Sequence, residues 1–255
     1  SVLWTACAWY ARTSLKGDEY RTRFEVFFLL ALTGNLTLIL AQDVPVFYTG
    51  FALMGFASAG LVAHRGDAAA RRAARLYVSL AVLGEVLLFV GFVYMVSSAG
   101  STSLSALQRA APVPVAQALL LVGFGIKAGA LTLHFWLPLA HPAAPLPASA
   151  VLSGTMIKAG LLGWLRFFPL GYAEQPELAV VFLAAGLGAS FLGTVVGATQ
   201  ENPKAVLAYS SISQMGIITT GLGMGMMAPQ AWPELLTAVL LYVAHHGLAK
   251  GALFL

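Results

Sequence analysis

Residues 124–145 read FGIKAGALTLHFWLPLAHPAAP, and this stretch places a lysine, Lys127, inside an apolar run that then fills with proline. A lysine ammonium is strongly hydrated, so an apolar neighbourhood has to offer it a polar partner or internal water. Gly125, Gly129 and the prolines at 138, 142, 145 and 147 also interrupt helical hydrogen bonding. If the run lies in a membrane, such broken backbone must be buried in protein or line a watery cavity.

The composition of the whole chain predicts an all-α polytopic membrane protein. The 255 residues are 59% hydrophobic and 9% charged, with a mean hydropathy of +0.82, whereas soluble domains carry about 25% charged residues. The chain begins and stops inside apolar sequence, so we expect a fragment of a larger subunit. After a partial segment at about 1–11, membrane-length helices are expected at about 24–41, 43–64, 76–98, 115–138, 147–169, 178–199, 204–224 and from 232 to the end.

The basic residues indicate a topology rather than a nucleic-acid partner. The net charge is +4, but the basic residues form no stripe and gather in loops between apolar segments. Nine basic residues fall on one side of the predicted membrane and two on the other, so the positive-inside rule predicts that the Arg-rich loops are cytoplasmic. The nine are Arg12, Lys16, Arg21, Arg23, Arg65, Arg71, Arg72, Arg75 and Lys204, and the two are Arg109 and Arg166.

Three ionisable residues lie near the centres of predicted membrane helices: Lys127 in 115–138, Lys158 in 147–169 and Glu85 in 76–98. Inserting a lysine at a helix centre costs about +2.5 to +3.5 kcal/mol. Such residues typically face one another or a hydrated cavity and relay protons or ions. The alternative is a lysine whose ammonium reaches the membrane surface, and this alternative is strongest for Lys250.

Histidines add candidate proton carriers, because imidazole titrates near neutral pH. His246 and Lys250 are four residues apart and share one helix face, with Tyr242 one turn earlier. His134 and His141 flank the FWLPLA sequence near a helix end. No cofactor is expected in this chain, because the single cysteine, Cys7, cannot ligate an iron–sulfur cluster and no nucleotide-binding fingerprint occurs.

Three motifs carry a resemblance to a known family: KAGALTLHFWLPLAHPAAPLPASAVLSGTMIKAG (127–160), ENPKAVLAYSSISQMGIITTGLG (201–223) and HHGLAKGALFL (245–255). They resemble signatures of the antiporter-like membrane subunits of respiratory complex I, membrane-bound hydrogenases and multisubunit cation/proton antiporters. The hydrogenase-type branch looks closest, and the match runs from about residue 43 to 255. Such a subunit would work beside other membrane subunits in the inner membrane of a bacterial cell.

The resemblance implies inverted five-helix repeats, each with a discontinuous helix. Residues 1–23 would be a truncated helix and cytoplasmic loop, 24–169 the first repeat and 170–255 the start of the second. Lys127 would be the central proton-carrying lysine and Lys158 the next lysine along a hydrophilic axis. His246 and Lys250 would link this axis to a second half-channel.

One departure from the family pattern concerns its membrane glutamate. Ala52, in GFALMGFAS, stands where the family usually has a glutamate that pairs with the central lysine. We hypothesise that Glu85, on the next helix, replaces it. The leading function is a proton-translocating subunit of an energy-converting redox complex, without a redox or hydrolytic site of its own. The alternatives are a subunit of a cation/proton antiporter or of a proton-coupled inorganic-carbon uptake complex, and a structural subunit that does not pump.

Overall fold

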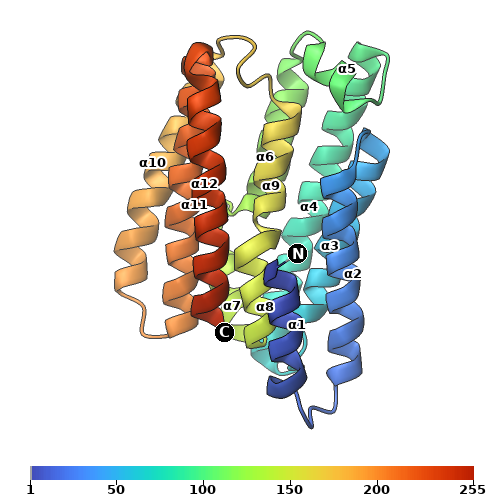
Figure 1. Cartoon of the computed structure of the whole chain (residues 1–255), viewed down its shortest axis with the longest axis vertical. Coiled ribbons are helices and arrows are strands. Elements are labelled where there is room, and N and C mark those ends of the chain that lie inside the picture. The colour runs from blue at the N-terminus through green and yellow to red at the C-terminus, as the bar shows by residue number, and fades with distance from the viewer. Residues whose placement is uncertain (1) are drawn as a thin grey trace.

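Long apolar helices run side by side along the longest dimension of the molecule (Figure 1). The computed structural model describes residues 2–255, and these form no β-sheet, only an isolated bridge between Asp43 and Ser103. The helices are α1 (Val2–Ser14), α2 (Arg21–Leu40), α3 (Val44–Val62), α4 (Ala68–Ala99), α5 (Leu104–Arg109), α6 (Pro114–Ala128), α7 (Leu137–Ala143), α8 (Leu146–Val151), α9 (Lys158–Phe167), α10 (Pro176–Ala198), α11 (Pro203–Met227) and α12 (Trp232–Phe254).

Five stretches of the described residues are long and apolar enough to cross a membrane: α2, α3, α4, the continuous stretch Leu146–Phe167, and α10. α11 and α12 have 25 and 23 residues, which at about 1.5 Å per residue also reaches across a hydrocarbon core of about 30 Å. Many large apolar side chains on these helices stay exposed, among them Leu40, Phe191 and Leu241. A surface of this kind suits lipid, and the prediction of an all-α polytopic membrane protein is confirmed.

The segment expected over 115–138 is a discontinuous helix, as the resemblance implied, and the chain breaks after Ala128. Gly129 adopts a left-handed conformation (φ +68°) and its N–H closes the end of α6 on the carbonyls of Gly125 and Ile126. The Trp136 indole N–H donates to the Ile126 carbonyl at 2.8 Å, so a carbonyl freed by the break still has a partner. The helix resumes as α7, with Pro138 in its first turn. Lys127 therefore lies at a helix end inside the bundle and not at a helix centre.

The expected helix over 147–169 is also irregular. α8 leads into one π-helical turn, Leu152–Met156, and α9 starts at Lys158. The Ile157 N–H bonds the Leu152 carbonyl at 3.2 Å, which is the wider spacing that defines this turn. Lys158 consequently starts a new helical segment immediately after the turn. Next to such a turn, fewer peptide carbonyls accept a hydrogen bond from the helix backbone.

An aromatic cluster joins the helices on which Lys127 depends. The rings of Phe47 (α3), Phe92 (α4), Phe124 (α6) and Phe167 (α9) pack with centroid separations of 4.7 to 6.4 Å. Aromatic pairs of this geometry contribute about 0.5–1.5 kcal/mol each beyond the area they bury. Because Phe124 is one turn before Lys127, the cluster fixes the end of α6 between α3 and α4.

Glycines let α2 and α3 approach closely. A Cβ atom on Gly34 would lie 2.4 Å from the backbone nitrogen of Met54, and one on Gly50 would lie 2.6 Å from that of Leu38. Small residues at helix crossings are how membrane helices gain contact without a hydrophobic driving force between them. This hairpin is joined to α9 by Arg166, whose guanidinium donates to the carbonyls of Leu38 and Ala41 at 3.0 Å and of Ile39 at 2.5 Å.

The two groups of basic residues lie at opposite ends of the bundle (Figure 1). The α1–α2, α3–α4 and α10–α11 loops lie together at one end, which we call the Arg-rich end. α5, which carries Arg109, and the α9–α10 loop beside Arg166 lie at the other. Two loops of the Arg-rich end are joined by a contact of 3.0 Å between His64 Nε2 and Asp18 Oδ2.

This loop contact predicts a pH dependence of stability. The hydrogen bond from His64 holds the pKa of Asp18 below its usual value of 3.8. Because the folded-state pKa is the lower one, the stabilisation is present above about pH 4 and is lost as the pH falls through the folded-state value. The contact is partly exposed, so we expect less than about 1 kcal/mol. Asp18→Asn should flatten the acid side of a melting-temperature profile, whereas an unchanged profile, like that expected for Glu19→Gln, would contradict this assignment.

Candidate functional site

Lys127 is buried, with 6% of its side chain exposed, and its ammonium has protein partners. Nζ donates to the hydroxyl oxygen of Tyr77 on α4 at 2.7 Å. It also lies 5.3 Å from the centre of the Tyr77 ring and 5.9 Å from that of Phe51, within the range of cation–π attraction. The Tyr77 ring packs edge-on against Trp136 at 4.9 Å. The partner of the lysine is thus held by the same tryptophan that closes the broken helix.

Glu85 comes to the same place from α4, also with 6% of its side chain exposed. A Cβ atom on Gly55 of α3 would lie 3.5 Å from Glu85 Oε1 and 3.7 Å from Lys127 Nζ, so both head groups lie close to that glycine. No ion pair joins them within the described residues, and Glu85 Oε2 has no hydrogen-bond partner there. The structure therefore brings the Glu85 carboxylate near the lysine without closing a salt bridge.

Lys158 starts a second polar group, built around the π-helical turn. Its ammonium donates to the Ser153 carbonyl at 2.5 Å. The Ser153 hydroxyl lies 2.7 Å from that of Ser211 on α11, and Ser211 donates in turn to the Leu207 carbonyl at 2.9 Å. Lys158 is partly exposed, whereas both serines are fully buried.

Lys250 and His246 complete this second group from α12. Lys250 Nζ donates to the same Leu207 carbonyl at 3.1 Å, so a continuous run of polar contacts links Lys158 to Lys250. Lys250 has 3% and His246 has 2% of its side chain exposed, and neither reaches the membrane surface. Neither ring nitrogen of His246 has a partner within the described residues, although Lys158 and Lys250 are near enough to interact with it electrostatically.

The two polar groups approach each other across Ser58 of α3. Its hydroxyl donates to the Met54 carbonyl at 2.5 Å and lies 3.1 Å from the sulfur of Met156, the last residue of the π-helical turn. Met54 is one residue before Gly55, the residue close to both Glu85 and Lys127. Glu85 and Lys127 thus form one polar group on α4 and α6, and Lys158, His246 and Lys250 form a second on α9 and α12. We call the two groups, together with Ser58 and Met156, the seam.

Sequence reasoning missed several polar members of the seam. Tyr77 precedes Glu85 by eight residues, which is close to two helical turns, so the shared face of α4 was a usable signal. Ser58, Ser153 and Ser211 had no such signal, because a membrane serine usually bonds its own helix backbone. Tyr242, considered as a relay residue, donates instead to the side-chain oxygen of Gln214.

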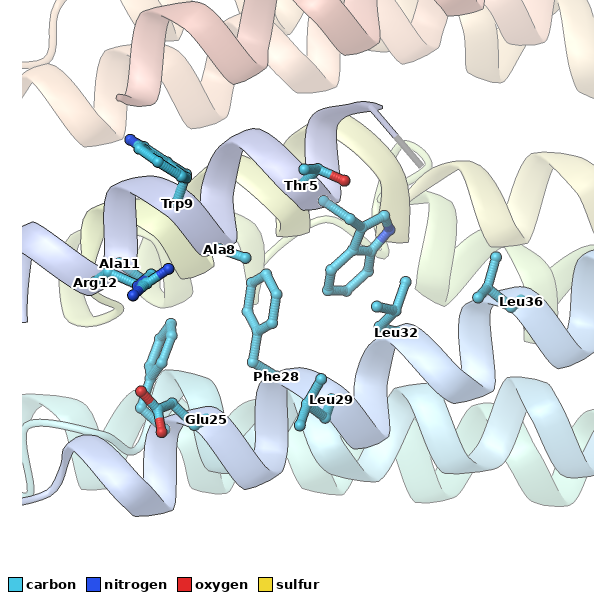
Figure 2. Close-up of a pocket in the computed structure, with 12 residues that line it drawn as sticks. Thr5, Ala8, Trp9, Ala11, Arg12, Glu25, Phe28, Leu29, Leu32 and Leu36 are labelled. Atoms are coloured by element: carbon cyan, nitrogen blue, oxygen red, sulfur yellow. The ribbon is translucent and has the colours of Figure 1, made fainter.

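The groove between α1 and α2 lies apart from this seam (Figure 2). Its lining is mainly apolar, with Phe28, Leu32 and Leu36 on α2 opposite Ala8 on α1. Its ionisable residues, Arg12 and Glu25, belong to the Arg-rich end, and none of the five candidate residues lines it. Elsewhere in residues 2–255, no three His, Cys, Asp or Glu side chains gather into a metal-binding cluster.

Buried amines along a polar seam, beside a discontinuous helix, are the arrangement that ion-translocating membrane proteins use. Comparison with known proteins agrees with this class. Residues 41–255 match the family described as NADH:quinone oxidoreductase/Mrp antiporter, transmembrane, and the chain belongs to this family.

Relatives and solved structures place the chain among several kinds of complex. It is 32% identical to "Hydrogenase-4 component B" of Escherichia coli, covering all of this chain and 40% of that protein. It is 28% identical to a Na(+)/H(+) antiporter subunit of Alkalihalophilus pseudofirmus, covering all of this chain and 52% of the relative. The chain thus spans about half or less of these relatives.

The solved structures that match are also chains of multisubunit complexes, and this chain covers less than half of each. A chain of the Mrp complex from Dietzia sp. aligns with a TM-score of 0.83 and 25% identity over 99% of this chain and 47% of that one. A chain of an archaeal respiratory complex, the membrane-bound sulfane sulfur reductase, aligns with a TM-score of 0.80 and 27% identity over 99% of this chain and 43% of that one.

Proposed function

We propose that this chain is part of a proton-translocating membrane subunit of an energy-converting redox complex, of the NADH:quinone oxidoreductase or hydrogenase type. The observation that carries the proposal is the seam that contains the buried Lys127, Lys250, Glu85 and His246 and the partly buried Lys158. An amine can accept and release a proton, but it has no lone pair to offer Na⁺ once protonated and is a poor ligand for a hard cation. The similarity to a hydrogenase component supports the redox setting.

The chain would act together with other membrane subunits, which would supply the driving energy, and would bind no redox cofactor itself. Its setting would be the inner membrane of a bacterial cell, with the Arg-rich end in the cytoplasm. A cation/proton antiporter subunit is the second candidate, favoured by the similarity to the Na(+)/H(+) antiporter relative and to the Mrp complex.

Proton flux through the complete complex, reconstituted into vesicles that contain a pH-sensitive dye, tests the proposal. Lys158→Gln is expected to lower the flux about tenfold, because it removes a proton carrier while keeping length and polarity. Lys16→Gln, at an exposed lysine of the Arg-rich end, is the matched control and should leave the flux unchanged. Full flux in an assembled Lys158→Gln complex would favour a structural subunit that does not pump.

The same vesicles separate the two transport functions. In a redox complex, adding the electron donor starts proton movement without any cation gradient. In an antiporter, an imposed Na⁺ or K⁺ gradient starts it without a donor.

A further inference from the structure

His141 on α7 is the most completely enclosed ionisable group outside the five candidate residues. Its side chain is fully buried, and neither ring nitrogen has a partner within the described residues. The ring stacks on Phe254 of α12, with centres 4.8 Å apart and planes 19° apart. Burying an imidazole without hydrogen bonds is unfavourable, because its ring nitrogens lose their bonds to water, and Leu or Phe would pack against Phe254 without that cost. The position therefore calls for a role for the ring nitrogens.

Amines from three helices surround this ring. Lys250 is one turn before Phe254 on α12, so the face of α12 that stacks on His141 also carries Lys250. Lys204, at the start of α11, donates to the carbonyl of Ala144, the residue that ends α7. Lys158 on α9 joins these two as the third cation close enough to act on the imidazole electrostatically.

A vestibule with a mixed polar and apolar lining opens along α7, at the Arg-rich end. Its volume is about 660 Å³, and its polar lining residues are Arg65, Asp67, Arg72 and Asn202. Pro138 and Pro142 of α7 form one wall. His141, adjacent to Pro142, is on the inner face, so one helix separates the vestibule from the lysines. Lys204 connects the two, since it is two residues after Asn202 of the vestibule and its ammonium donates to the Ala144 carbonyl at the end of α7.

We propose that His141 is a proton-carrying residue of an uptake path that runs from this vestibule, past Lys204, to Lys158 and Lys250. The proposal rests on the proposed function and adds to it the residues through which protons reach the seam. In each passage one ring nitrogen binds a proton from the vestibule side. The other nitrogen then releases a proton to a neutral amine of Lys158 or Lys250, and the imidazole returns to its neutral form. No electrons move, and the net change is one proton transferred from the vestibule to the amine.

Flux measurements on the whole complex in vesicles test the role of the ring. His141→Gln is expected to lower proton flux about tenfold, because the amide fills the site but carries no proton. In His141→Ala, added imidazole is expected to restore at least half of the lost flux, which a purely structural histidine would not show. Flux within twofold of the unaltered complex in His141→Gln, or no recovery with imidazole, overturns the proposal. His245→Gln, at the exposed histidine of α12, is the control.

A second measurement keeps His141 in place and tests the vestibule, in case the histidine variants do not assemble. Leu139 lines the vestibule and is 44% exposed, whereas the native Cys7 is buried. A positively charged thiol reagent on Leu139→Cys is expected to lower flux at least threefold. The same reagent on Ser105→Cys, exposed at the opposite end, should have no effect. Unchanged flux in labelled Leu139→Cys rejects the vestibule as the uptake route. If Lys158→Gln also keeps full flux, the proposed function itself fails, so the two failures are distinguishable.

Discussion

Glu85→Gln and Lys127→Ala are each expected to lower proton flux about 100-fold, since each removes one member of a proton-transfer pair. The head groups of the two residues both lie close to Gly55, with Glu85 Oε1 and Lys127 Nζ at 3.5 Å and 3.7 Å from the position of an added Cβ atom. Glutamine keeps the shape of Glu85 but removes its charge and its ability to hold a proton. The measurement is dye-reported flux in vesicles, with Glu177→Gln, an exposed glutamate of α10, as the control.

The Glu85 prediction also tests whether this carboxylate replaces the one that the family places at the position of Ala52. If it does, Ala52→Glu in the Glu85→Gln background should recover part of the flux, because it brings a carboxylate back to α3. Retained flux in Glu85→Gln would instead show that Lys127 works with Tyr77 alone. Lys127→Ala would then still stop the flux, so the two residues would be separated experimentally.

Gly34→Ala is expected to destabilise the protein by about 3 kcal/mol, the upper part of the range for forcing extra atoms into a packed interior. The added methyl would lie 2.4 Å from the Met54 nitrogen and 2.7 Å from the Gly50 carbonyl oxygen. Both are backbone atoms, so the clash cannot be relieved by rotating a side chain, and α2 and α3 have to separate. Loss of folded protein during detergent denaturation measures the effect.

Gly84→Ala is the matched control, since the nearest atom to its added methyl is the Gly123 carbonyl oxygen at 3.4 Å. We expect a change below about 1 kcal/mol there. Equal stability of the Gly34→Ala and Gly84→Ala proteins would mean that α2 and α3 do not cross as closely as the structure has them.

Composition and apolar segment length were enough to predict the fold class, because a chain with few charges has few ways to be soluble. They could not place the break after Ala128. Glycine and proline are common inside intact membrane helices, so Gly129 and Pro138 signal a possible break without fixing where it falls. Its position depends on Trp136 reaching the Ile126 carbonyl, which is a tertiary contact.

The candidate site could likewise be predicted only in part: its charged residues could be found from the sequence, but their partners could not. A buried charge is visible in sequence because it costs insertion energy, and this singled out Lys127 and Glu85. The hydrogen-bond partner of Lys127 could not be predicted in this way. Tyr77 is fifty residues away in sequence, and a tyrosine in an apolar helix is common. The run from Lys158 through Ser153 and Ser211 likewise depends on a π-helical turn that no residue pattern specifies.

Arg166 gives α9 one fixed end and one adjustable end. Its guanidinium occupies three carbonyls at the end of α2, groups that would otherwise need water where the membrane provides little. That end of α9 is therefore a pivot. Any rocking of the helix must be taken up at the opposite end, where the turn over Leu152–Met156 contains one surplus residue and the Lys158 amine is attached. A small tilt of α9 at that end would change the position of the Lys158 ammonium.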